Sequence, residues 1–310
     1  MSKLMYQAFG LTISSDILFP ELCSVTLPEQ TPDVSIKFGD LQTVWADQAT
    51  PNDHFVANAD YVLFKIASTA LFRIQDGEKI VISPFKGADE GAIRLFVLGS
   101  CLGVILLQRK LFPLHGSAVA IHGKAYAFIG ASGAGKSTLA SELIKMGYSL
   151  LSDDVTAITL SEQSLPVVTP SYPQQKLWKE TLHAMGEESS QYVPLYDRQT
   201  KFSVPVRDCF ESHPIELAGI FELRKTDQGA VRIFLPHKID QFQLLIKHTF
   251  RNFFIPDMGL SQWHFEMVAR IVKCFDLYSI ERPCQGAFSA HLIATQILDQ
   301  IKHTQKLTVN

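Results

Sequence analysis

One short segment combines residue types and a spacing that suit phosphate binding. Residues 130–137 read Gly-Ala-Ser-Gly-Ala-Gly-Lys-Ser and match the pattern G-x-x-x-x-G-K-[ST] with no mismatch. The glycines let the backbone turn its N–H groups toward an anion, while the lysine suits the β- and γ-phosphates and the final serine hydroxyl suits Mg²⁺. This Walker A motif, or P-loop, predicts binding of ATP and magnesium. The predicted nucleotide-binding residues are Gly130, Ala131, Ser132, Gly133, Ala134, Gly135, Lys136, Ser137 and Thr138, and Ser137 is also a predicted metal ligand.

Two adjacent carboxylates, Asp153 and Asp154, follow this loop after one helix and one strand. A right-handed crossover would place that strand parallel to the strand before the loop, with its carboxyl end at the phosphate site. One carboxylate could then hold Mg²⁺ while the other accepts or orients the proton of an attacking hydroxyl. Many nucleotide-binding proteins share the loop alone, so the aspartate pair is the feature that favours phosphate transfer to a hydroxyl.

The elements that must position these residues can be read on both sides of the loop. Residues 124–129 form an apolar run that predicts a central strand ending at Gly130. Residues 136–146 place apolar side chains on one helical face, and Gly147 suits the end of that helix. Residues 148–151 predict the next strand, which ends at the aspartate pair. The order strand, loop, helix, strand is the context that the phosphate-binding motif requires.

Residues 1–88 read as a β-rich accessory region in front of a catalytic domain that spans residues 89–310. Asp76-Gly77 separates two alternating runs, which predicts a hairpin with a type I′ turn because both turn residues need positive φ. The region predicts a small antiparallel sheet, and it contains no recognisable catalytic constellation.

The nearly continuous apolar stretch at residues 95–107 is shorter than the roughly 20 residues of a membrane span. It predicts a buried core helix near 90–110, where we place the domain boundary. Beyond it, the chain reads as mixed α/β. Further strands are predicted at 33–38, 61–66, 114–121, 155–160, 202–206, 217–223, 231–234 and 277–281, and helices at 175–184, 239–250, 261–275 and 288–303.

Charge and cysteine usage limit the classes of partner. The formal net charge is −3, which gives no overall positive field for nucleic acid or an anionic membrane. The five cysteines include no CxxC pair, so a reducing cytosol fits better than a disulfide framework or a zinc site. No apolar run at the amino terminus is long enough for a signal peptide. We therefore expect a cytoplasmic protein without nucleic-acid or membrane partners. The cysteines are Cys23, Cys101, Cys209, Cys274 and Cys284.

The segment that holds these motifs resembles the catalytic domain of HPr kinase/phosphorylase. A His-Gly pair at His115, the glycine-rich loop and the segment ending in Asp153-Asp154 follow that family's order and spacing over residues 115–160. The family phosphorylates a serine of a small phosphocarrier protein. The resemblance implies a P-loop mixed-sheet α/β kinase domain. It also implies a general base at Asp153, a magnesium-associated carboxylate at Asp154 and a histidine beside the reacting phosphate at His115.

Residues 8–11, 107–109 and 170–178 resemble a divergent branch of HPr-kinase-like proteins, encoded beside clusters for ribosomal peptides, including lasso peptides. Some members of that branch phosphorylate a serine of the precursor peptide. The Glu-x-Arg-Gly signature of the phosphocarrier kinases is not found after the aspartate pair. This departure weakens the case for a phosphocarrier substrate and for phosphorolysis.

Four cations in the C-terminal half are candidate substrate contacts, namely Lys176, Lys201, Arg251 and Arg282. One or two of them could clamp transition-state charge or an acidic peptide. For each, the alternative is an ordinary surface cation.

The sequence thus predicts an ATP-dependent phosphotransferase that acts on a serine or threonine hydroxyl of a peptide or small protein. Its predicted catalytic residues are Lys136, Asp153 and His115, and its cofactors are ATP and Mg²⁺. A kinase of a small hydroxylated metabolite and a non-catalytic ATP-binding regulatory protein stay open as alternatives. HPr kinases form oligomers, so a homo-oligomer also stays open.

Overall fold

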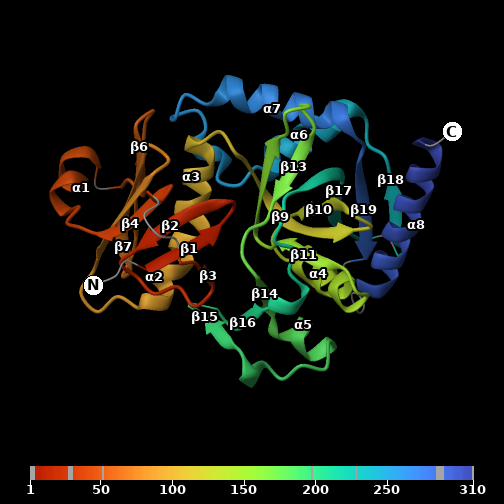
Figure 1. The fold of residues 1–310 in the computed structure, drawn as a ribbon, viewed down its shortest axis with the longest axis horizontal. Coiled ribbons are helices and arrows are strands. Elements are labelled where there is room, and N and C mark those ends of the chain that lie inside the picture. The colour runs from red at the N-terminus through yellow and green to blue at the C-terminus, as the bar shows by residue number, and fades with distance from the viewer. Residues whose placement is uncertain are drawn as a thin grey trace.

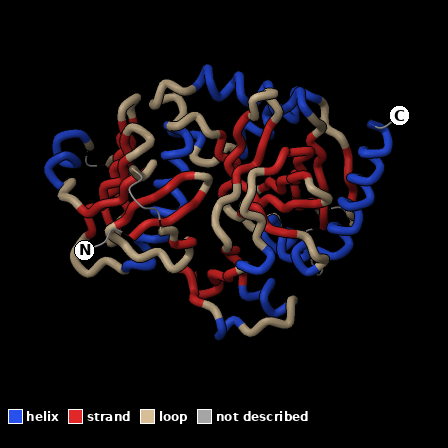
Figure 2. The backbone as a smooth tube through the Cα atoms, in the orientation of Figure 1, coloured by secondary structure: helices blue, strands red, loops and turns tan. Residues whose placement is uncertain are grey.

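The computed structural model describes residues 4–26, 31–50, 52–196, 198–227, 229–283 and 290–308. Within these ranges the strands form two large sheets and one small sheet. The two large sheets lie side by side, and a long helix runs beside the first of them, toward the second (Figure 1). The same division appears as two groups of strands in Figure 2.

The first sheet is mixed and has the strand order β3-β1-β2-β4-β8-β7-β6-β5. Strand β4 pairs in parallel with both β2 and β8, so the antiparallel sheet predicted for this region is wrong at its centre. Long connections, including helix α1, lead into and out of β4, and parallel neighbours need such crossovers instead of tight turns. The elements are β1 (Leu4–Ala8), β2 (Leu11–Ser15), β3 (Cys23–Ser24), β4 (Val34–Phe38), α1 (Gln42–Gln48), β5 (Phe55–Ala57), β6 (Tyr61–Ile66), β7 (Ala70–Gln75) and β8 (Lys79–Pro84).

The hairpin between β7 and β8 has the predicted turn. Asp76 and Gly77 have φ of 58° and 66°, and the Glu78 N–H donates to the Gln75 carbonyl over 3.1 Å. Positive φ at both central residues is the signature of a type I′ turn, so this prediction is confirmed.

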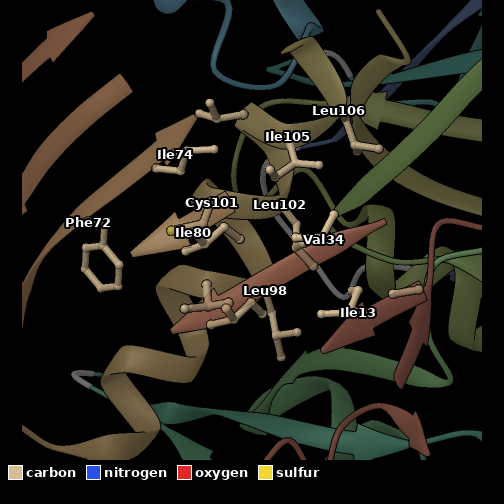
Figure 3. Close-up of a cluster of buried hydrophobic side chains, with 14 of the residues drawn as sticks. Ile13, Val34, Phe72, Ile74, Ile80, Leu98, Cys101, Leu102, Ile105 and Leu106 are labelled. Atoms are coloured by element: carbon tan, nitrogen blue, oxygen red, sulfur yellow. The ribbon is translucent and has the colours of Figure 1, made fainter. Parts of the chain in front are cut away.

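The predicted core helix consists of α2 (Glu90–Phe96), a π-helical turn η1 (Val97–Cys101) and α3 (Leu102–Gln108). Its apolar side chains pack against those of β2, β4, β7 and β8. Figure 3 shows this cluster, with Ile13, Val34, Phe72, Ile74 and Ile80 from the strands and Leu98, Cys101, Leu102, Ile105 and Leu106 from the helix. The helix is long and apolar enough to cross a membrane, but most of it is buried inside the fold.

The second sheet contains the strands on either side of the glycine-rich loop. Strand β10 pairs in parallel with β17, and β17 pairs in parallel with β19. Strand β9 lies antiparallel between β10 and β11, so β11 runs parallel to β10 as predicted. The strands are β9 (Phe112–Ile121), β10 (Lys124–Gly130), β11 (Ser149–Ser152), β12 (Val155–Leu160), β13 (Pro166–Thr169), β17 (Ile215–Thr226), β18 (Arg232–Phe234) and β19 (Leu277–Pro283).

Helices cover both faces of this sheet because the side chains of β10 alternate. Ala127 and Ile129 pack with α6 and α7, whereas Tyr126 and Phe128 pack with α4 and α8. The two helix layers are visible on either side of the second sheet in Figure 1. The helices are α4 (Lys136–Lys145), α6 (Lys238–His248), α7 (Ser261–Cys274) and α8 (Ala290–Thr308), with a short 3₁₀ turn η4 (Asn252–Phe254) before α7.

We call the first sheet with the core helix the first unit, and the second sheet with its covering helices the second unit. A third, three-stranded sheet adjoins the second unit, and one sequence prediction is wrong there. The helix predicted at 175–184 begins only at residue 179, because the preceding residues pair with β16 as a strand. Leu177 is buried against Phe202 in this sheet, and that tertiary contact overrides the local helical pattern. The elements are β14 (Gln174–Trp178), α5 (Lys179–Ala184), η2 (Ser189–Gln191), β15 (Val193–Leu195), β16 (Arg198–Pro205) and η3 (Arg207–Cys209).

Cys23, Cys101, Cys209 and Cys274 are free thiols, and Cys284 lies outside the described residues, as do the first two residues of the helix predicted at 288–303. The boundary between residues 88 and 89 stays a prediction. The core helix, which follows it, shares one hydrophobic cluster with the first sheet and with Val155 and Ala157 of β12.

Candidate active site

A cavity of about 860 Å³ lies between the two large units. One side is formed by the glycine-rich loop, β9, β14 and β16. The other side is formed by the turn after β6, at residues 66–69, and by the core helix, including Gly99 and Ser100 of its π-helical turn. The first unit therefore contributes a wall to the site, although its sequence shows no catalytic pattern.

The loop between β10 and α4 has a backbone that only glycine adopts readily. Gly130 has φ of 144°, and a Cβ there would lie 2.5 Å from the Leu223 carbonyl oxygen. Gly133 and Gly135 have φ of 75° and 105°, and Gly135 is the N-cap of α4. Residues of the loop and of the first turn of α4 line the cavity. The unpaired N–H groups and positive dipole end of the helix are thus available to an anion there.

Lys136 lies over the loop, with its Nζ 2.8 Å from the Gly130 carbonyl oxygen and 3.2 Å from that of Ala131. The side chain is buried, and burial lowers the pKa of Lys136 while the nearby carboxylates of Asp153 and Asp154 oppose that shift. Within the described residues the hydrogen bonds of this buried ammonium go to loop carbonyls, which are uncharged, so the charge is available to a phosphate oxygen.

Asp153 is fixed by three hydrogen bonds and is only 4% exposed. Its Oδ1 accepts from the Ser117 hydroxyl at 2.6 Å and from the Ser137 hydroxyl at 2.9 Å. Its Oδ2 accepts from the backbone N–H of Lys176 at 2.9 Å. Asp153 does not belong to the cavity lining, so it lies behind Ser137 and away from the open space.

Asp154 lines the cavity, and its side chain is 24% exposed. Its backbone has φ of 72°, an uncommon value for a residue with a side chain. Oδ2 pairs with the Lys176 ammonium at 2.6 Å. Burial alone would raise the pKa of Asp154. The positive charge of Lys176, followed by that of His115 at a pH low enough to protonate its ring, outweighs burial and holds the pKa well below its usual range. The carboxylate is therefore ionised at neutral pH and faces the space beside the loop.

His115 on β9 contacts the same aspartate through the backbone. Its Nδ1 lies 2.9 Å from the Asp154 carbonyl oxygen, which can only accept, so a neutral ring carries its proton on Nδ1. Burial, followed by the positive charge of Lys136, lowers the pKa of His115. The ring is therefore neutral at neutral pH, with the Nε2 lone pair unprotonated.

The oxygen atoms near the loop suit Mg²⁺. Among the described residues no group of three or more His, Cys, Asp or Glu side chains could hold a metal ion. Magnesium nevertheless binds through one or two protein oxygens when substrate phosphates and water supply the remaining ligands. Ser137, at the start of α4, provides such an oxygen, and Asp153 accepts the hydrogen bond of its hydroxyl. The donor set therefore fits a magnesium–nucleotide complex better than an all-protein metal site.

The four predicted substrate cations all line the cavity. Lys176 is the ion-pair partner of Asp154, and Lys201 lies 5.4 Å from the centre of the Trp178 ring. Arg282 donates to the Ala134 carbonyl at 2.8 Å and to that of Gly133 at 3.3 Å, so it braces the loop. Arg251 donates to the Ser100 hydroxyl at 2.6 Å. All four cations therefore lie at the cavity, and their contact with a substrate stays a prediction.

Most other predicted residues also line the cavity. The exceptions are Gly130, Ala131 and Ala134 of the loop and Asp153, which are not part of the lining. Two residues that contact the candidate site residues were not predicted from the sequence, namely Ser117 and Ser100. Ser117 lies two residues after His115 on one strand, and this period of two could have identified it. Ser100 lies in an apolar helix that gives no such signal.

Comparisons with known proteins give one local and distant relationship. No protein-family model matches the chain. A segment of 64 residues, which is 20% of this chain, is 38% identical to HPr kinase/phosphorylase from Mycoplasmopsis pulmonis. The match spans only about a fifth of that relative's length, 21%. The solved structure of the Hpr(Ser) kinase/phosphatase from Coxiella burnetii aligns with 64% of this chain and 94% of its own, at 13% identity and a TM-score of 0.35.

Proposed function

We propose that this protein is an ATP-dependent phosphotransferase that phosphorylates a serine or threonine hydroxyl of a peptide or small protein. The observation that carries the proposal is the position of Asp154, an ionised carboxylate in the wall of a cavity that also contains Lys136 and the first turn of α4. In protein kinases a carboxylate beside the phosphates accepts the proton of the substrate hydroxyl, and Asp154 has a matching position. The local relationship to HPr kinase/phosphorylase supports the same reaction class.

The proposed roles of the two aspartates differ from those that the family resemblance implies. The resemblance gives the general base at Asp153 and the metal-associated carboxylate at Asp154. The geometry favours the reverse, because Asp153 is buried against the Ser137 hydroxyl whereas Asp154 faces the open cavity. We therefore assign Asp153 to the magnesium side of the site and Asp154 to the acceptor side.

In this mechanism Lys136 and the loop N–H groups bind and position the phosphates, and Arg282 braces the loop. Ser137 would hold Mg²⁺ through its hydroxyl oxygen, while Asp153 accepts the hydrogen bond of that hydroxyl and orients it. The metal neutralises charge on the phosphates when bound. The acceptor oxygen forms a bond to the γ-phosphorus as the bond to the β–γ bridging oxygen breaks, which releases ADP. Asp154 orients the hydroxyl and receives its proton. Since its pKa is depressed, it is a weak base, and the proton leaves late, after the new bond has begun to form.

His115 and Lys176 hold Asp154 in this position. The Nδ1–H of His115 binds the Asp154 backbone, and the Lys176 ammonium binds its carboxylate. We also propose that the enzyme acts in the cytoplasm and that its acceptor is made in the same compartment. The free cysteines of the described chain fit a reducing environment.

The test is transfer of label from γ-³²P-ATP in the presence of Mg²⁺. Peptides that contain serine or threonine are compared with small hydroxylated metabolites as acceptors, and Lys136→Ala serves as the control. We expect acid-stable label on the peptides and a loss of several orders of magnitude in the variant. Label on metabolites alone would favour the metabolite kinase. Wild-type transfer by Lys136→Ala would refute the role of the loop.

A further inference from the structure

A second, smaller pocket opens beside the phosphate-site cavity. It has a volume of about 150 Å³, and its lining includes Phe55 and Phe64 from the first sheet and Phe253 and Phe254 from η4. Ile66, Ser100 and Arg251 line both this pocket and the large cavity. The two hollows therefore adjoin at these three residues, and we call the smaller one the aromatic pocket.

The walls of the aromatic pocket are rings in close contact. The centroid of the Phe254 ring lies 5.0 Å from that of Phe55 and 4.3 Å from that of Phe253. Phe254 is buried and forms the rigid side, whereas Phe253 is 46% exposed. A cavity of about this volume with apolar walls holds a group the size of a benzene ring in other proteins. The pocket therefore fits one aromatic or large aliphatic side chain.

Arg251 marks the junction between the two hollows and has an unmet hydrogen-bonding need. Its backbone is left-handed, with φ of 55°, and its guanidinium lies against the rings of Phe250 and Phe253 at 5.3 and 5.8 Å. Nη2 donates to Ser100, but the buried Nε has no hydrogen-bond partner among the described residues. A buried N–H without an acceptor is costly, and strained residues of this kind cluster at binding sites.

We propose that the acceptor is a peptide with an aromatic or large aliphatic residue within one or two positions of the phosphorylated hydroxyl. The apolar side chain occupies the aromatic pocket while the hydroxyl enters the large cavity beside Asp154. This assignment rests on the proposed phosphotransferase function. In this proposal the first unit helps to bind the acceptor peptide, because Phe55, Phe64 and Ile66 belong to its strands.

The test uses two pools of serine peptides that differ only beside the serine. One pool carries Phe or Leu within two positions of it, and the other carries Asn or Ser at the same positions. Transfer from γ-³²P-ATP is measured as kcat/KM, and MgATP binding is measured separately. We expect the wild-type enzyme to prefer the apolar pool by about tenfold or more, the range for burial of one large side chain.

Phe253→Asp should reduce kcat/KM for the apolar pool by a similar factor, because it places a charge at the pocket mouth. Phe253→Leu should retain most of the preference. Phe265→Asp on α7 is the matched control, since Phe265 is 59% exposed and belongs to neither hollow. It should behave as wild type. Equal use of both pools by a protein that binds MgATP, or a preference that survives Phe253→Asp, overturns this proposal alone. Absence of MgATP binding overturns the proposed function and this proposal with it.

Discussion

At the scale of single residues, the two adjacent aspartates differ in their surroundings. Asp153 accepts three hydrogen bonds and is almost fully buried, whereas Asp154 pairs with one lysine and faces the cavity. Neighbouring carboxylates on one strand end can divide two tasks only if their environments differ in this way.

The first prediction concerns Asp153→Asn. The amide keeps the shape of the side chain but removes the negative charge beside Ser137, where we expect Mg²⁺. MgATP affinity should fall, and the Mg²⁺ concentration for half-maximal transfer should rise about tenfold or more. A Mg²⁺ titration at fixed ATP measures this change. A wild-type metal requirement in this variant would place the metal elsewhere.

The second prediction concerns the ion pair between Lys176 and Asp154. In Lys176→Met the cation that lowers the pKa of Asp154 is lost, and burial of the carboxyl then raises that pKa. The acid limb of the pH–rate profile should therefore move to higher pH. The pair's contribution to stability is present above the unfolded carboxyl pKa and is lost as pH falls through the folded value, so the variant should also be less stable at neutral pH.

Profiles of kcat/KM against pH for wild type and Lys176→Met measure the shift. Lys124→Met is the control, because Lys124 pairs with Glu216 and does not line the cavity. If both variants keep the wild-type acid limb, the pairing does not set the ionisation of Asp154.

At the scale of elements, the core helix packs closely against Phe250, beside the candidate site, at a position occupied by a glycine. A Cβ at Gly103 in α3 would lie 2.6 Å from the Phe250 ring, which in turn lies beside the ring of His115. The third prediction is that Gly103→Ala lowers the free energy of unfolding by about 1–3 kcal/mol, as overpacked substitutions do.

Gly99→Ala in the π-helical turn of the same helix is the matched comparison, since nothing lies within 4 Å of an added Cβ there. It should be neutral or stabilising by up to about 1 kcal/mol, because alanine restricts the unfolded chain. Urea unfolding of both variants measures the difference. Equal stabilities would show that the ring of Phe250 moves aside at no cost.

Local sequence signals predicted the elements that depend on short-range geometry. The glycines of the loop and the Asp76-Gly77 turn need positive φ, a requirement written in the residue types themselves. The strand pairings and the strand that the sequence did not predict depend on distant partners. Strand β4 is parallel to its neighbours because of its crossovers, and β14 is a strand because β16 pairs with it.

The same distinction applies to the site. The spacing of Lys136 and the aspartate pair predicted that these residues lie close together at one side of the cavity, because one helix and one strand connect them. The opposite wall includes Ser100 and Ile66, which are distant in sequence from the loop. No local sequence pattern indicates that they lie near it. Arg251 and Lys176 could be named as candidates from the sequence, but not their contacts with Ser100 and Asp154.

At the scale of the whole molecule, the two units cannot be separated at residue 88 without exposing the core helix. Its apolar face is buried by β2, β4, β7 and β8. The fourth prediction is that a chain starting at residue 89 loses solubility and cooperative unfolding, because that face becomes solvent-exposed. Soluble yield and a thermal melt followed by circular dichroism measure this. A soluble, cooperatively folding fragment with full transfer activity would show that the first unit is dispensable.

The most direct test of the account is Asp154→Asn, assayed for γ-phosphate transfer and for MgATP affinity in parallel. The change is nearly isosteric and removes only the carboxylate that we assign to the acceptor side. We predict that transfer falls by about 10²–10⁴-fold, the range for loss of a general base, while MgATP affinity changes by less than about threefold. Transfer within threefold of wild type, or loss of MgATP binding in step with the rate, would contradict the assignment of Asp154 to the acceptor side.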